Sequence, residues 1–265
     1  MLAVLAGIGL AVALNKGTLA LPDVIAAQIP PTSDIVQEVG LGLDQVSISG
    51  LHSTSDEAVF KALDLDRTRS LWSLDTKAAR LRLEELPWVA SAELTRVYPG
   101  QLDVRITERA AFALWRHDGR EELIDKTGRV LQAVYAGRIT HLPVVAGEDA
   151  AREAANLLVL LARYKPLAES FSWAERVNGR RWSVHLNTGG RIELPADGEA
   201  LALSELEANG QLSALLADAP TIVDLRAPGR IAIRPAEGVT SSSKHRSVAG
   251  IGALIEEIGR KGGRP

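Results

Sequence analysis

Two stretches near the middle of the first half of the chain alternate apolar and polar residues with a period of two. The first covers residues 90–95 and the second covers residues 101–107. This period is typical of β-strands with one buried face. Pro99 and Gly100 lie between the two stretches and favour a tight turn. These residues therefore predict two sequential strands joined by a short turn.

A further strand and two short helices are expected before this pair. Residues 45–49 also alternate, which predicts a strand. Thr54 followed by Glu57 has the spacing of a helix N-cap with a carboxylate in the first turn. A second helix is predicted from Asp75, and Pro87 ends it. The predicted order is therefore strand, helix, helix, strand, strand.

From Ala111 the pattern changes to short strand-like runs separated by turn residues, which is typical of an antiparallel β domain. Two helices are expected to interrupt these runs, at residues 150–164 and 199–216. The expected strands are residues 112–115, 122–124, 130–134, 181–186, 191–194, 221–226 and 230–234. We therefore predict an α+β protein with two folded parts.

The two ends of the chain differ from this folded body. The first 14 residues contain no charged or strongly polar side chain, and this run is shorter than the roughly 20 residues that a membrane-spanning helix needs. We interpret residues 1–21 as a partial transmembrane helix; the alternative is a signal peptide, although no basic residue precedes Leu2. Either interpretation places the rest of the chain outside the cytoplasm. A linker at residues 22–42 and a flexible tail at residues 236–265 complete the predicted layout.

Composition and charge exclude several classes of function. The 265 residues carry a net charge of only -3, which gives no strong attraction to nucleic acid. The absence of cysteine excludes disulfides, thiolate nucleophiles and cysteine zinc sites. The five histidines are scattered, and we find neither a phosphate-binding glycine-rich loop nor a pair of catalytic carboxylates. We therefore predict no catalytic residue, no metal ligand and no cofactor, and expect a protein that is not an enzyme.

Three short motifs carry a resemblance to a known family: LPWV at residues 86–89, RVYP at residues 96–99 and ERAAFALW at residues 108–115. Similar segments follow at residues 123–130, 142–145 and 222–226. Over residues 43–235 the chain resembles the FtsQ (DivIB) family of bacterial cell division proteins. The resemblance implies a POTRA domain at residues 43–110, with the strand and helix order predicted above. It also implies that residues 111–235 are the FtsQ β domain.

The resemblance further implies a function. Members of the family are non-catalytic scaffolds of the divisome, with most of the chain in the periplasm and a helix in the inner membrane. The implied partners are FtsB, which arrives with FtsL, and other division proteins that bind the POTRA domain. Through these partners the protein would help regulate septum formation and septal peptidoglycan synthesis. An alternative is a POTRA-containing outer-membrane assembly or secretion factor, which would need a long run of amphipathic barrel strands that we do not find.

The resemblance also implies where the partner binds. The matching positions are Arg226, Ala227, Gly229, Arg230, Ile231, Ala232, Ile233, Arg234 and Pro235. A strand at the edge of a sheet has unpaired N–H and C=O groups, and a partner segment can pair with them by β-augmentation. We expect Ile231 and Ile233 to face the core, and Arg230, Ala232 and Arg234 to face outward. The arginines suit an acidic partner; an ordinary edge strand protected by charge is the alternative.

Overall fold

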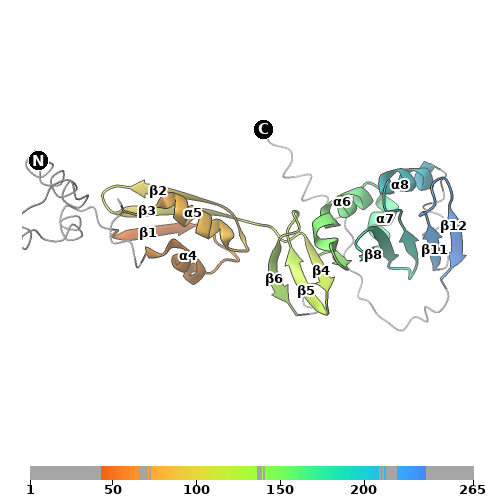
Figure 1. Cartoon of the computed structure of the whole chain (residues 1–265), viewed down its shortest axis with the longest axis horizontal. Coiled ribbons are helices and arrows are strands. Elements are labelled where there is room, and N and C mark those ends of the chain that lie inside the picture. Colours follow the sequence, from red (N-terminus) through yellow and green to blue (C-terminus); the bar gives the residue numbers. More distant parts are fainter. Residues whose placement is uncertain are drawn as a thin grey trace, which may run out of the picture. The chain divides into compact units, whose positions relative to one another are not determined.

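The computed structural model describes residues 43–65, 71, 73–135, 139, 141–208, 210, 212 and 220–236. The predicted membrane helix at residues 1–21, the linker at residues 22–42 and all but the first residue of the predicted tail lie outside the described residues. No helix among the described residues is long and apolar enough to cross a membrane. The chain divides into two compact units, Met1–Arg109 and Ala110–Pro265, and each is described by itself (Figure 1).

The described part of the first unit has the predicted order of elements. It contains β1 (Gln45–Ser49), α4 (Asp56–Leu63), α5 (Thr76–Glu85), β2 (Val89–Val97) and β3 (Gln101–Glu108). The strand order is β1-β3-β2, with β1 parallel and β2 antiparallel to β3. The N-cap of α4 is Ser55, one residue after the predicted Thr54, and its side chain accepts a hydrogen bond from the Ala58 N–H. Apolar residues of both helices and of all three strands form one hydrophobic cluster.

The second unit contains a larger sheet, called the large sheet below, with the strand order β12-β11-β10-β9-β8-β7-β4-β5-β6. Its strands are β4 (Ala113–His117), β5 (Arg120–Ile124), β6 (Val130–Val134), β7 (Val144–Ala146), β8 (Phe171–Val177), β9 (Arg181–Leu186), β10 (Arg191–Glu193), β11 (Thr221–Asp224) and β12 (Ala232–Pro235). Its described helices are α6 (Ala150–Ala162), α7 (Lys165–Ser170) and α8 (Glu199–Ala208). The protein is therefore α+β, as predicted.

The large sheet is mixed, whereas the sequence analysis predicted an antiparallel β domain. The pairs β4·β7, β7·β8 and β10·β11 are parallel. A parallel pair needs a long crossover, which is usually a helix. Here α6 and α7 connect β7 to β8, and α8 lies in the connection between β10 and β11. The prediction was wrong because it treated the helices as interruptions between strands and missed β7, β8 and α7.

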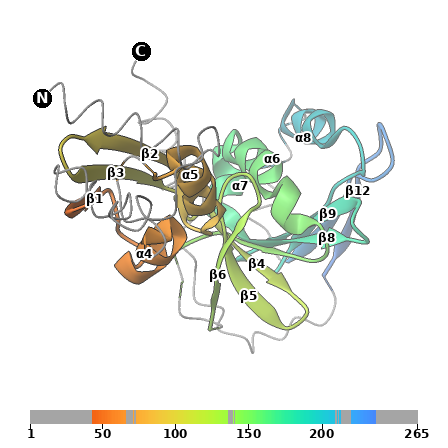
Figure 2. The same ribbon diagram turned by 60° about the vertical axis from the view of Figure 1, so that its left-hand side comes forward.

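The helices of the second unit lie on one face of the large sheet, where the core is (Figure 2). Leu157, Leu158 and Leu161 of α6 and Leu203 and Leu206 of α8 belong to one buried cluster with residues of the sheet. The last predicted helix, residues 199–216, is not continuous over that range. It ends at Ala208, and Gly210 follows in a turn with a φ of +64° that favours glycine.

Candidate functional site

The predicted partner-binding strand is the last strand at one end of the large sheet. Among the described residues β12 pairs with β11 alone, and the pair is antiparallel. All four residues of β12 are exposed. The backbone groups of β12 that point away from β11 therefore have no strand partner in the described part of the chain, as can be followed in Figure 1.

The structure divides the nine predicted positions between a turn and a strand. The Arg230 N–H donates a hydrogen bond to the Ala227 carbonyl over 3.1 Å, and Gly229 has a φ of +68°. Residues 225–231 thus form the connection from β11 to β12, and the strand begins at Ala232 instead of the predicted residue 230. All nine positions therefore lie along one continuous segment that ends in the edge strand β12.

Contrary to the prediction, the core does not cover the side chain of Ile233. Its side chain is 50% exposed, whereas Ile231 is partly buried against the core cluster. Residues paired directly across strands share a face, and Ile233 pairs with Val223. The same row continues strand by strand through Ile192, Val184, Ala174 and Val145, and every one of these side chains is at most 3% exposed, as is that of Val223. Ile233 therefore has the predicted orientation, but the core cluster ends at β11.

The three arginines of the site are not equivalent. The Arg226 guanidinium donates hydrogen bonds to both carboxylate oxygens of Asp224, with Nε at 2.8 and 3.0 Å. These hydrogen bonds raise the pKa of Arg226 and, with the nearby charges of Arg226 and Arg234, lower the pKa of Asp224. Arg230 and Arg234 are exposed. Since Arg226 already has a carboxylate partner, Arg230 and Arg234 are the cations best placed to meet an acidic segment.

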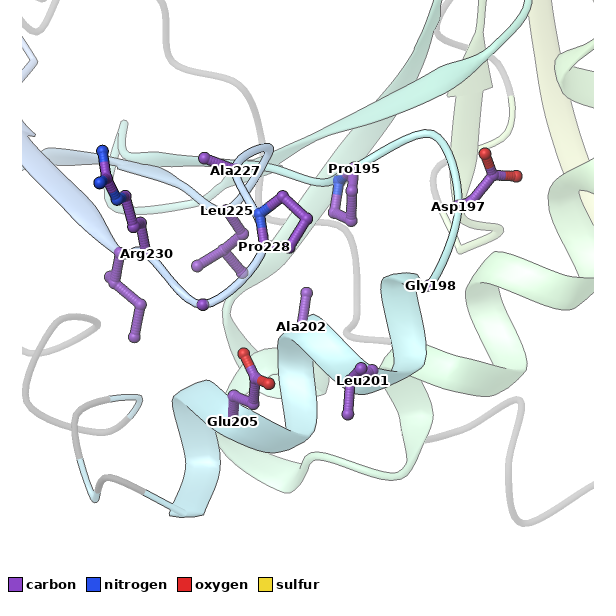
Figure 3. Close-up of a pocket in the computed structure, with 12 residues that line it drawn as sticks. Pro195, Asp197, Gly198, Leu201, Ala202, Glu205, Leu225, Ala227, Pro228 and Arg230 are labelled. Atoms are coloured by element: carbon purple, nitrogen blue, oxygen red, sulfur yellow. The ribbon is translucent and has the colours of Figure 1, made fainter.

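A pocket lies beside the connection between β11 and β12. One wall is formed by residues 227–231 and the other by α8 (Figure 3). Figure 3 shows Ala202 and Glu205 on the α8 side, and Leu225 also lines the pocket. Leu201, which also lines the pocket, is 64% exposed.

The sequence analysis did not identify this pocket, although α8 contains a signal for it. Leu201 and Leu203 are two residues apart, which on an α-helix places them about 200° apart around the axis. Leu203 is fully buried, so Leu201 must lie on the other side of the helix. An exposed leucine on a helix next to an open sheet edge is the feature that could have indicated a binding surface.

Titratable groups elsewhere in the second unit are held by local contacts. The His185 ring stacks on Trp173 with 3.9 Å between ring centroids. Burial and the charge of Arg191 lower the pKa of His185 to about 4, so this side chain is neutral near pH 7. The His117 Nε2 atom lies 3.0 Å from an oxygen of Glu122. No group of three or more metal-ligating side chains occurs within the residues that the structure describes.

Comparison with known proteins gives two adjoining family matches. The POTRA domain, FtsQ-type, matches residues 41–109. The C-terminal domain of cell division protein FtsQ/DivIB matches residues 113–226. These matches agree with the strand and helix order of the first unit and with the β-rich second unit. The second match ends at Arg226, so β12 lies beyond the matched residues.

Curated relatives carry the same description. The cell division protein FtsQ of Rhizobium radiobacter is 36% identical over 185 residues, which are 70% of this chain and 88% of the relative. That of Agrobacterium fabrum is 34% identical over 207 residues, and the match spans 78% of this chain but only 65% of the relative's length. Among solved structures, the major extracytoplasmic domain of the cell division protein DivIB from Geobacillus stearothermophilus matches 42% of this chain and 96% of its own, at 20% identity and a TM-score of 0.28. The sequence matches carry the assignment, because that score supports no argument about the fold.

Proposed function

The chain belongs to the FtsQ/DivIB family of bacterial cell division proteins, and from this premise we propose that it is a non-catalytic scaffold of the divisome. It binds an FtsB-type protein, which arrives with an FtsL-type protein, on the outer side of the inner membrane. Through this complex it helps regulate septum formation and septal peptidoglycan synthesis. The chain is attached to the inner membrane through its N-terminal apolar segment, and the POTRA domain binds other division proteins.

The observation that carries this proposal is the half-exposed Ile233 at the open edge of β12. A partner strand that pairs with β12 satisfies the outward N–H and C=O groups of the strand. It also places a side chain next to Ile233 and extends the buried row of the large sheet by one strand. Since Ile233 is 50% exposed, covering it contributes about 1 kcal/mol in addition to the backbone hydrogen bonds.

Charge selects the kind of segment that binds. Arg230 and Arg234 are exposed at the two ends of the strand region, and they attract a segment that carries Asp or Glu. The same charges repel a second copy of the strand, so they oppose pairing between two β12 edges. Binding is therefore expected to favour an acidic, extended segment over self-association.

The test is the variant Ile233→Pro, because proline removes a backbone N–H from the edge and also the exposed isoleucine side chain. We expect this variant to weaken binding to the extracytoplasmic region of the FtsB-type protein of the same bacterium by about 100-fold or more. Binding is measured by isothermal titration, and folding is checked by circular dichroism and thermal unfolding.

The matched control is Ala133→Pro in β6, at the opposite end of the same row of residues. It introduces the same change into the other edge strand of the large sheet, and we expect it to leave the dissociation constant within about twofold of the wild type. A folded Ile233→Pro variant that binds with undiminished affinity would show that β12 is not the binding edge.

A further inference from the structure

We propose that the pocket between α8 and residues 227–231 holds one apolar side chain of the same partner segment that pairs with β12. This inference rests on the proposed function and makes it more specific, since it states which residues the segment must contain. The pocket adjoins the strand directly: Ile231 lines the pocket, and β12 begins at the next residue.

The walls of the pocket are suited to an aliphatic side chain. Leu201, Ala202, Leu225, Pro228 and Ile231 contribute apolar surface from both sides. The hollow measures about 110 Å³. A protein cavity of about 150 Å³ takes up benzene, so this smaller hollow suits a valine, leucine or isoleucine side chain better than a large aromatic one.

The register of β12 determines which partner residue reaches the pocket. Side chains two residues apart on a strand share a face, so Ile231 and Ile233 lie on the helix-covered side of the large sheet. The partner residue opposite Ile233 lies on that side too, and the residue two positions further along lies beside Ile231 and the pocket. In an antiparallel partner this second residue is C-terminal to the first, and in a parallel partner it is N-terminal.

Charge on the two faces gives the rest of the pattern. Arg234 lies on the face opposite to Ile233, so the partner residue across from Arg234 is expected to be acidic. At the pocket, Asp197 and Glu205 carry carboxylates, which disfavour an acidic residue there (Figure 3). For an antiparallel partner the recognised sequence is therefore acidic, apolar, any residue, apolar.

The test fills the pocket from the α8 side with Ala202→Leu. We expect the affinity for the extracytoplasmic region of the FtsB-type protein to fall about tenfold, because the added side chain occupies the space of the partner residue. The matched control is Ala208→Leu on the same helix, an exposed position that does not line the pocket, with affinity within about twofold of the wild type. A second variant, Leu201→Asp at the 64% exposed rim, places a charge at the pocket without altering the core and is expected to weaken binding about as much.

Alanine substitutions along the partner segment complete the experiment. At one apolar partner residue, two positions from the residue opposite Ile233, substitution by alanine is expected to lower the affinity for the wild-type protein about tenfold. The same substitution is expected to leave the affinity for the Ala202→Leu variant unchanged. If Ile233→Pro abolishes binding while both Ala202→Leu and Leu201→Asp bind normally, the pocket is not used and the inference is overturned, although β12 remains the binding edge. If Ile233→Pro itself binds normally, the proposed function fails, whatever the pocket variants do.

Discussion

The large sheet ends in two edge strands, β6 and β12, that differ in how the apolar row of the sheet reaches them. Toward β6 the row runs through Trp115 and then Glu122, whose carboxylate lies 3.0 Å from His117, before it ends at the exposed Ala133. Toward β12 the row stays apolar to its last residue, and Ile233 is 50% exposed. The apolar row thus gives way to polar contacts near β6 and ends in an exposed apolar side chain at β12.

The backbone at the two edges differs as well. The pairing of β5 with β6 shifts register between Leu123 and Ile124, and Leu131 of β6 is buried. A register shift of this kind bends an edge strand and reduces its ability to pair with another chain. No register shift interrupts the pairing of β11 with β12. We therefore expect the partner to bind the β12 edge, where a regular strand and an uncovered apolar row coincide, and not the β6 edge, where only unpaired backbone is available.

The largest effect is expected from two substitutions, each of which disturbs the packing next to one of the two edge strands. A Cβ atom at Gly190 would lie 2.8 Å from the Thr221 carbonyl oxygen, so Gly190→Ala pushes β11 away from the rest of the large sheet. We expect the free energy of unfolding to fall by about 2 kcal/mol and partner affinity to fall by about 30-fold. Hydrogen exchange should show faster exchange in β11 and β12 than in the wild type.

The counterpart is Gly128→Ala in the connection between β5 and β6. A Cβ atom there would lie 2.6 Å from the Ala151 carbonyl oxygen, so a comparable loss of stability, about 2 kcal/mol, is expected. Partner affinity should stay within about twofold of the wild type, because the damage lies at the β6 end. Equal losses of affinity in the two folded variants would mean that the two ends do not differ in function.

A smaller effect on partner affinity is expected when one exposed charge near each edge is reversed. Arg230→Glu reverses an exposed charge beside β12, and we expect it to weaken binding about fivefold at low salt and less at 0.5 M salt, since surface charges are screened. Arg120→Glu is the control, because Arg120 is exposed on β5, near the other end of the large sheet, and the substitution changes the net charge equally. A dissociation constant for Arg230→Glu that equals that of the control at low salt would argue against an acidic partner.

Much of the fold could be predicted from the local sequence pattern, because apolar and polar residues alternate along a strand with one buried face. The structure has β6 at Val130–Val134 and β9 at Arg181–Leu186, with the predicted bounds, and the predicted hairpin strands fall within β2 and β3. The alternation of apolar and polar residues did not reveal the strands that are very short or whose pairing is irregular. β7 has only three residues and lies between two parallel neighbours, and the pairing of β8 shifts register between Phe171 and Trp173.

The site shows a different limit of prediction. Its position at the last strand came from the family resemblance, and period-two alternation predicted the direction of Ile233 correctly. The exposure of Ile233 depends on how far the helices cover the large sheet, which no local pattern contains. The pocket likewise needs α8 and residues 227–231, which are about 25 residues apart in the chain, to lie side by side.

The smallest expected effect concerns an ion pair next to each edge. Asp224 pairs with Arg226 on the β12 side, and Glu121 pairs with Arg116 on the β6 side. Asp224, Arg116 and Glu121 belong to the same row on the other face of the large sheet, and Arg226 follows the end of β11. Hydrogen bonds from Arg226 lower the pKa of Asp224 in the folded state, so the ionised carboxylate stabilises the fold above its ordinary pKa of about 3.9. This stabilisation is lost as the pH falls through the lowered pKa.

Asp224→Asn should therefore reduce the free energy of unfolding at pH 7 by less than about 1 kcal/mol, because the pair is partly exposed to solvent. The difference from the wild type should shrink as the pH falls below about 4, as followed by urea unfolding at several pH values. Glu121→Gln is expected to cost more at pH 7, because Glu121 is only 8% exposed and its loss leaves Arg116 without that carboxylate. A larger loss for Asp224→Asn than for Glu121→Gln would contradict this order, and would mean that the β12 end, with its solvent-exposed pair, depends more on its ion pair than the closed β6 end does.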